Sequence, residues 1–314
     1  MSEYKPCRPN SIGGQALIEG VMMRGKDKLA MAVRKPDGEI ELKVEALKKS
    51  NHLKFLKWPI IRGVVALISS MIIGVRALTY SAEFFVEGDG TEQKGKFETW
   101  LYAKLGKKAD DVIMAFSIVF AIVFAMLLFG AAPTALVSFL RGYVDNNMLL
   151  SAIEGVVKIA MFVAYILLIS QMKDIKRVFQ YHGAEHKTIH CYESGKAVNV
   201  ANARTFTTLH PRCGTSFIFF VLMISIILFT FISWNSVWVR LLSKLIMFPV
   251  VAGLSYEMIR VAGKSNHPLV RALSYPGLMM QKITTSEPDD AQLEVAIAAF
   301  LSVLDDEEAK AVTI

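Results

Sequence analysis

Residues 112 to 129 read Val-Ile-Met-Ala-Phe-Ser-Ile-Val-Phe-Ala-Ile-Val-Phe-Ala-Met-Leu-Leu-Phe, and no charged residue interrupts them. A helix needs about 20 consecutive apolar residues to cross the hydrocarbon core of a bilayer. The apolar run continues to Leu140 across Pro133, so it is long enough. This stretch therefore predicts a transmembrane helix and a membrane protein.

Further apolar runs extend this prediction to the whole chain, which is 53% hydrophobic. A weaker run contains Arg62 and Arg76 on either side of a short apolar core. The strong runs cover 152–171, 216–234 and 245–259, and the weaker one covers 59–80. We predict a mainly α, polytopic helical membrane protein with about four transmembrane helices, one interfacial or re-entrant helix (59–80) and a small N-terminal β-sheet.

The distribution of lysine and arginine predicts the orientation. The segment before Gly63 contains 13 of these residues, whereas the connection 141–151 contains only Arg141. Basic segments stay on the cytoplasmic side. If 59–80 does not cross, all basic segments are cytoplasmic, so we expect a multi-pass protein of the cell membrane with both termini in the cytoplasm. The net charge of +7 then acts at the lipid surface. Nucleic acid is not an expected partner, because no basic stripe is interleaved with aromatic residues.

Three parts of the chain differ in character. Residues 1–50 are predicted to form a small cytoplasmic β-rich segment, with strands at 16–23, 28–34 and 39–44. Residues 51–285 form the helical membrane domain, with a cytoplasmic His-rich insert at 172–215. Residues 286–314 form a cytoplasmic amphipathic helix suited to docking on another surface. Its apolar stripe consists of Leu293, Ile297, Phe300, Leu301 and Leu304.

Residues 181–193, Tyr-His-Gly-Ala-Glu-His-Lys-Thr-Ile-His-Cys-Tyr-Glu, contain the candidate functional residues. We expect 172–193 to continue the second span as one helix. His182, His186 and His190 then lie on one face, one turn apart. His182, Glu185 and His186 fit the H-x-x-E-H pattern of inverted zinc peptidases. Two imidazoles at this spacing can hold one ion, and Glu185 can activate water as a general base.

The remaining ligands are left open by the sequence. His190 could be a third ligand or could orient His186, and His210 and Cys213 follow in His-Pro-Arg-Cys-Gly. Imidazole, carboxylate and thiolate groups suit zinc, so we expect a divalent metal, zinc, bound by His182, His186, His190, His210 and Cys213 or by a subset of them. Alternatively, the histidines only cap helices and form hydrogen bonds at the level of the lipid headgroups.

Four stretches of the sequence resemble the bacterial YqhQ family of integral membrane proteins. They are Gly-Gly-Gln-Ala-Leu-Ile-Glu-Gly-Val-Met-Met-Arg-Gly (13–25), Tyr-His-Gly-Ala-Glu-His-Lys (181–187), Leu-His-Pro-Arg-Cys-Gly-Thr-Ser (209–216) and Thr-Thr-Ser-Glu-Pro-Asp-Asp (284–290). The likeness extends from about Gly13 to Leu304. It implies a domain of unknown function that is labelled a predicted metal-dependent enzyme, and it implies no substrate or reaction.

Three hypotheses follow. The leading one is a membrane-embedded, metal-dependent enzyme, a hydrolase, with a cytoplasmic-facing His/Glu/Cys site and an unknown substrate. The second is a non-enzymatic scaffold or assembly protein whose terminal helix recruits a protein partner or a second copy of the chain. The third is a transporter, which the small number of ionisable residues within the apolar runs makes harder to support. In all three the lipid bilayer is a partner.

Overall fold

The structure, a computed structural model, describes residues 12–47, 58–86, 108–211, 213–232, 236–262 and 267–313, and the single residues 56, 104 and 234. The chain divides into two compact units. Unit 1 comprises Met1–Phe85, Ala164–Ile224 and Pro249–Ile314, and unit 2 comprises Val86–Val163 and Ser225–Phe248. Each unit is described by itself below. The first eleven residues of the predicted β-rich segment, and Cys7 with them, lie outside the described part of the chain.

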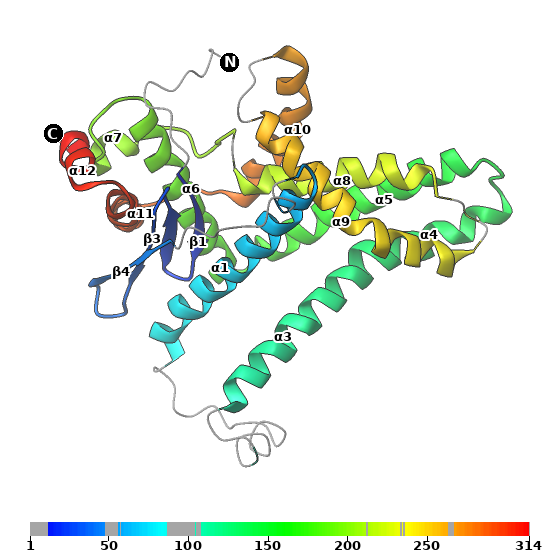
Figure 1. The fold of residues 1–314 in the computed structure, drawn as a ribbon, viewed down its shortest axis with the longest axis horizontal. Helices are drawn as coiled ribbons and strands as arrows, with labels where there is room; N and C mark the ends of the chain where they lie inside the picture. Colours follow the sequence, from blue (N-terminus) through cyan, green and yellow to red (C-terminus); the bar gives the residue numbers. More distant parts are fainter. Residues whose placement is uncertain are drawn as a thin grey trace. The chain divides into compact units, whose positions relative to one another are not determined.

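The predicted class is confirmed: the protein is mainly α and polytopic, with a small N-terminal sheet (Figure 1). Four helical stretches are long and apolar enough to cross a membrane: Ile61–Phe85, Val112–Gly142, Asn147–Ile169 and Val237–Ala262. The first lies in α1 (Ile61–Val86), and the last two are α5 and α9. The second combines α3 (Lys108–Met126), the π-helical turn η2 (Leu127–Ala131), α4 (Ala132–Ser138) and the 3-10 turn η3 (Phe139–Gly142).

Two of the apolar helices differ from their predicted lengths. The segment that we predicted as interfacial or re-entrant forms the 26-residue α1, which length and composition allow to cross a bilayer. The positive charge of Arg62, in the first turn of α1, is neutralised because Arg62 donates two hydrogen bonds to the Glu257 carboxylate. The span predicted at 216–234 is α8 (Gly214–Thr230), which has only 17 residues. At 1.5 Å per residue α8 measures roughly 26 Å, slightly less than the ~30 Å hydrocarbon core.

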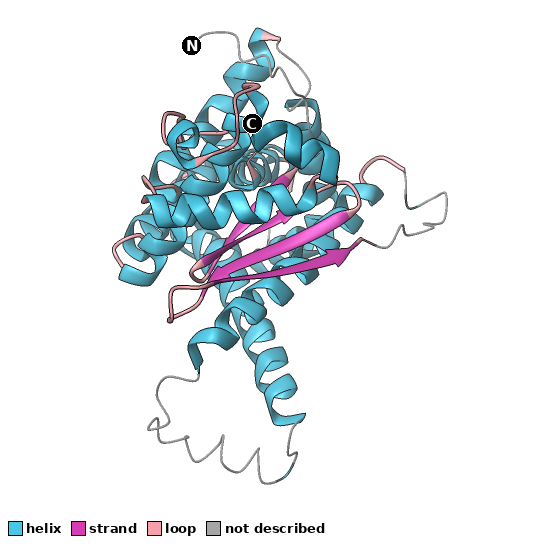
Figure 2. Cartoon of the chain, turned by 90° about the vertical axis from the view of Figure 1, so that its left-hand side faces the viewer, coloured by secondary structure: helices cyan, strands magenta, loops and turns pink. Residues whose placement is uncertain are grey.

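The N-terminal sheet has four antiparallel strands in the order β1-β2-β3-β4 (Figure 2). They are β1 (Gly13–Leu17), β2 (Gly20–Arg24), β3 (Lys28–Arg34) and β4 (Ile40–Ala46). The single strand predicted at 16–23 is wrong, because the chain reverses between Leu17 and Gly20, which are paired. Glu19 adopts a positive φ of 48° in this turn. A non-glycine residue in that conformation is uncommon and gives no sequence signal.

The remaining helices of unit 1 are α6 (Lys173–Glu193), α7 (Val200–Ala203), α10 (Pro268–Thr284), α11 (Asp290–Val303) and α12 (Asp306–Thr313). The expectation that 172–193 continues the preceding span is wrong. The helix α5 ends at Ile169, and Met172 is extended, with ψ at 134°. The histidine-bearing helix α6 is therefore a separate element.

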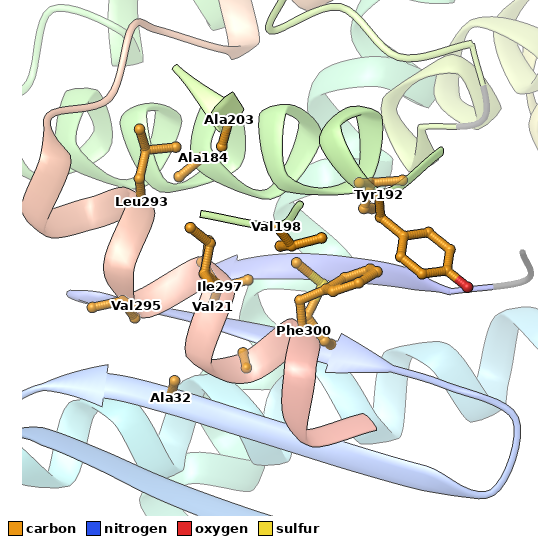
Figure 3. Close-up of a cluster of buried hydrophobic side chains, with 14 of the residues drawn as sticks. Val21, Ala32, Ala184, Tyr192, Val198, Ala203, Leu293, Val295, Ile297 and Phe300 are labelled. Atoms are coloured by element: carbon orange, nitrogen blue, oxygen red, sulfur yellow. The ribbon is translucent and has the colours of Figure 1, made fainter. Parts of the chain in front are cut away.

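The core of unit 1 lies between the sheet, α6 and α11. Helix α11 packs on β2, β3 and α6. Figure 3 shows Leu293 of α11 beside Ala184 of α6, and Ile297 of α11 beside Val21 of β2. A capping box of Asp289 and Gln292 fixes the start of α11. The apolar stripe of the predicted terminal helix is therefore buried against the chain's own sheet, which corrects the expectation that it docks elsewhere.

The opposite face of the sheet carries a second cluster of apolar side chains. Leu17, Met22 and Met31 are buried there together with Ala77 of α1, and Ile73 and Tyr80 of α1 pack against them. The C-terminal half of α1 thus covers the face of the sheet that α11 leaves open. The sheet is enclosed on both sides within unit 1.

Candidate metal centre

Helix α6 carries the histidine row through the centre of unit 1. Every residue from Gly183 to Glu193 is buried, although the segment is polar. A buried polar side chain is costly unless it is hydrogen-bonded, so the partners of these groups determine what the site can do. The close approach of α6 to its neighbours depends on Gly183, where a Cβ atom would lie 2.1 Å from the carbonyl oxygen of Ser286.

His182 is held by hydrogen bonds at both ring nitrogens. Its Nδ1 lies 2.8 Å from the carbonyl oxygen of Thr284, and its Nε2 lies 3.1 Å from Sγ of Cys213. A carbonyl oxygen can only accept, so Nδ1 carries the proton. The lone pair of Nε2 in the neutral ring therefore faces the cysteine sulfur.

His186 repeats this arrangement one turn further along α6. Its Nδ1 donates to the carbonyl oxygen of Thr208. Its Nε2 is fully buried and has no hydrogen-bond partner among the described residues. The rings of His182 and His186 are 4.4 Å apart between centroids. Burial lowers the pKa of His186 to about 4, so the imidazole is neutral at physiological pH.

Cys213 reaches the two histidines from the turn before α8. One ring nitrogen of each histidine and Sγ of Cys213 form a group of potential metal ligands, whose atoms all lie within 4.8 Å of one another. Burial alone would raise the pKa of the Cys213 thiol, but His186 and hydrogen bonds from Thr215 lower it overall. A lowered pKa favours the thiolate, which is the form of cysteine that binds metals.

Glu185 lies beside this group, on the side of α6 that faces β1. Its carboxylate accepts a hydrogen bond of 2.9 Å from the backbone N–H of Gly14. Burial raises the pKa of Glu185 to about 7, and Cys213 adds to this shift, while the hydrogen bond from the backbone N–H of Gly14 opposes it. A carboxyl group with a pKa near 7 can both accept and release a proton at neutral pH.

His190, Glu193 and His210 form a second group of potential ligands, also within 4.8 Å of one another and all buried. Nε2 of His190 donates to the carbonyl oxygen of Leu209 at 2.8 Å, and Nε2 of His210 lies 3.4 Å from the Glu193 carboxylate. The backbone of His210 is fixed by Gln281, which accepts from its N–H and donates to its carbonyl oxygen. The two groups are neighbours, since the rings of His186 and His210 are 5.6 Å apart.

The structure thus divides the five predicted ligands between two groups. His182, His186 and Cys213 come together with Glu185 beside them, whereas His190 and His210 join Glu193, which we had not included. Glu19, in the turn between β1 and β2, pairs with Arg177 and accepts a hydrogen bond from the Tyr181 hydroxyl.

The sequence analysis missed the backbone groups that orient the site. These are the carbonyl oxygens of Thr208 and Thr284 and the N–H of Gly14. The sequence offers one signal for them, which is their position. Gly14 and Thr284 lie within the quoted stretches 13–25 and 284–290, and Thr208 directly precedes the stretch 209–216.

Fold and site together define a polytopic helical membrane protein in which two groups of side chains, among the described residues, could hold a metal ion. A family model described as "Protein of unknown function (DUF1385)" matches residues 58–306. The "Uncharacterized protein YqhQ" of Bacillus subtilis (strain 168) is 35% identical over 310 residues, which cover 97% of this chain and 95% of that protein. The chain therefore belongs to the DUF1385 family and is a relative of YqhQ, so the resemblance noted in the sequence is confirmed. No solved structure matches the chain significantly.

Proposed function

We propose that the protein is a metal-dependent hydrolytic enzyme whose zinc ion is held by His182, His186 and Cys213. The observation that carries this proposal is the buried Nε2 of His186, which has no hydrogen-bond partner among the described residues. Such an unsatisfied nitrogen is costly. It belongs to the same compact group of ligand atoms as a second imidazole nitrogen and a thiol sulfur.

The donor set fits zinc in type and number. Two imidazoles and one thiolate are ligands that zinc prefers, and catalytic sites keep three protein ligands and one open position. Metal-binding histidines donate their other N–H to a carbonyl or carboxylate, which fixes the ring and the tautomer. Both His182 and His186 meet this condition through Thr284 and Thr208. Bound there, a zinc ion would supply Lewis-acid polarisation and would make water more acidic.

The chain's own residues would then position and move protons. Glu185 accepts a proton from water at its carboxylate, which the N–H of Gly14 holds in place. Its raised pKa of about 7 allows it to return that proton to a leaving group. The half-buried ring of His182 is the most accessible of the three ligands and therefore lies nearest to solvent.

The packing of unit 1 supports a cytoplasmic site. The sheet, α6 and α11 share one core, although apolar helices separate them in the sequence. The sheet lies before α1, helix α6 lies between α5 and α8, and helix α11 comes after α9. They must lie on the same side of the membrane, so the chain crosses an even number of times between them. Three apolar segments lie between β4 and α6, namely α1, 112–142 and α5, and at most two of them can cross the membrane. Helix α1 packs on the sheet and is the one that does not.

The remaining spans are 112–142, α5, α8 and α9. With the basic N-terminal segment inside, this arrangement gives a cell-membrane protein with both termini in the cytoplasm.

The decisive experiment is elemental analysis of protein purified in mild detergent without added metal or chelator. We expect close to one zinc per wild-type chain and almost none in the His182→Ala, His186→Ala double variant. The matched control is His267→Ala, since His267 caps the start of α10 and is exposed. Wild-type protein that is folded but metal-free, and that binds no zinc on titration, would refute the proposal.

The hydrolytic part requires a separate variant. Glu185→Gln keeps the shape of the side chain and removes the base. We expect it to retain zinc and to lose hydrolysis of ester or amide substrates by the protein in nanodiscs. General-base contributions are typically about 100- to 10,000-fold. Equal turnover by Glu185→Gln and wild type would exclude the role of Glu185 as the base.

The scaffold hypothesis loses its main support in this structure. It relied on an exposed apolar stripe on the terminal helix, but Leu293 and Phe300 are completely buried and Ile297 nearly so. A partner would have to displace α11 from the sheet before it could bind that stripe.

A further inference from the structure

A cluster of charged side chains is buried inside unit 2, within apolar helices. Glu154 of α5 accepts hydrogen bonds from Arg240 of α9, at 2.7 and 3.1 Å, and from Lys244. Arg240 also donates to Ser151 and stacks on the ring of Trp234 at 4.0 Å. These charged groups are at least 90% buried. An ionisable group within a membrane segment usually indicates a function.

Lys158 adds a further positive charge that the cluster does not balance. It lies four residues after Glu154, one helical turn further along α5, but it forms no ion pair with Glu154. Within residues 108–163, 225–232 and 236–248, Lys158 makes no hydrogen bond or ion pair, although only 6% of it is exposed. Its ammonium group lies 5.1 Å from the ring centroid of Phe229. The ammonium group of Lys244 lies 5.5 Å from the same centroid.

The charges in this cluster are therefore unequal. One carboxylate, Glu154, faces three basic side chains, and two of the ammonium groups share a single aromatic ring. Lys158 lies near the middle of the 23-residue α5, where the surroundings are apolar. A charge in a low-dielectric environment is retained when an opposite charge or a hydrogen-bond acceptor is nearby. An oxyanion supplies both to Lys158 and Lys244.

We propose that Lys158 and Lys244, with Arg240 behind them, form a binding site for an oxyanion within the membrane helices. The ligand chemistry is a phosphate group, either in the headgroup of an anionic phospholipid or as free inorganic phosphate. Lys158 provides the main contact because it has no ionic partner among the residues that the structure describes. Lys244 and Arg240 are held in place by Glu154 and contribute positive potential. This site is independent of the proposed metal centre, since all of its residues belong to unit 2.

The test measures the thermal unfolding midpoint of delipidated, detergent-solubilised protein with two probes. One arm compares phosphatidylglycerol with phosphatidylcholine, and the other compares inorganic phosphate with chloride at equal ionic strength. A ligand that binds only the folded state raises the midpoint in proportion to its occupancy. A rise with phosphatidylglycerol alone identifies the lipid headgroup, and a rise with phosphate identifies the free ion. No rise in either arm overturns the proposal.

Variants assign the effect to this cluster. Lys158→Met keeps the length and apolar character of the stem, and we expect it to weaken the binding of the stabilising anion at least tenfold. Lys196→Met is the matched control, because Lys196 also lies over a phenylalanine ring, that of Phe206 at 5.3 Å, but is exposed. An unchanged affinity in Lys158→Met overturns the proposal. If that variant does not fold, native mass spectrometry of the wild type decides: one anionic phospholipid or phosphate must stay bound after delipidation.

Discussion

Replacement of Gly183 by alanine tests whether the segment 284–287 orients the metal ligands. A Cβ atom at this position would lie 2.1 Å from the carbonyl oxygen of Ser286, and ordinary contacts begin at 3.4 Å. The segment 284–287 must therefore move away from α6 by more than 1 Å. Ser286 also donates its N–H to the carbonyl oxygen of Phe179, so the movement breaks a backbone contact to α6.

The displaced segment contains the carbonyl oxygen of Thr284, which accepts from Nδ1 of His182 at 2.8 Å. An added separation of more than 1 Å removes this hydrogen bond. Loss of a group that orients a metal-binding histidine typically lowers metal affinity about 10- to 100-fold, or roughly 1.4–2.7 kcal/mol. We expect this loss of zinc affinity in Gly183→Ala, measured by competition with a chelating dye on folded protein.

Stability should respond in the same direction. Alanine is better than glycine in a helix by about 1 kcal/mol, but overpacking costs about 1–3 kcal/mol. We therefore expect a thermal midpoint equal to or below that of the wild type. Gly214→Ala is the control: Gly214 follows Cys213 in sequence and begins α8, but an added Cβ meets nothing within 4 Å. Wild-type zinc affinity in Gly183→Ala would refute the orienting role of the segment.

Three further predictions concern the core, the base and pH. Phe300→Ala should destabilise unit 1 by about 3–5 kcal/mol, seen as a lower thermal midpoint, because the ring is completely buried against the sheet and Tyr192; a loss below 1 kcal/mol would contradict the packing. Gly14→Ala should reduce hydrolysis but not zinc content, since its Cβ would lie 2.6 Å from the carbonyl oxygen of Met22 and 2.9 Å from Cδ of Glu185, and β1 would have to shift together with the N–H that holds this carboxylate. Gly13→Ala meets nothing within 4 Å and should be silent. The metal-free protein should lose stability as pH rises from 6.5 to 8, because burial raises the pKa of Glu193 to about 8 and the folded state then holds a proton that the unfolded state has released. Below pH 6.5 His186 and His210 oppose this trend, because they are buried as neutral rings and their pKa values are lowered to about 4. If the Glu193→Gln variant shows the same slope of stability against pH between pH 6.5 and 8, Glu193 is excluded as the cause.

The sequence predicted the membrane class because apolar length is a local property that one segment expresses alone. It also predicted which side chains could bind a metal. The sequence did not predict how those side chains divide into two groups, because His182 and His190 lie on the same helix yet face different partners. Cys213 approaches His182, while His210 approaches His190. The turn before α8 determines this division, and its conformation depends on contacts with Gln281 in a distant helix.

The fate of the terminal helix illustrates a second limit. Its apolar stripe was recognised, and the stripe is indeed buried. A hydrophobic pattern predicts that one face of a helix is buried, but it does not predict which other element buries that face. The sheet that receives α11 lies more than 250 residues away in sequence, as the bond from Arg34 to the carbonyl oxygen of Ala291 illustrates. The missed turn at Ile18 and Glu19 has a similar origin, since the Glu19 side chain is held by Arg177 of the distant helix α6.

The assembly of one core from the sheet, α6 and α11 has a consequence for biogenesis. A ribosome releases the sheet first and α11 only after every candidate membrane helix has emerged. Until then one face of the sheet and part of α6 stay uncovered, and quality-control factors can recognise them. Completion of this core therefore requires that every candidate membrane helix between the sheet and α11 has already been synthesised. Chains arrested before residue 290 should be degraded rather than accumulate.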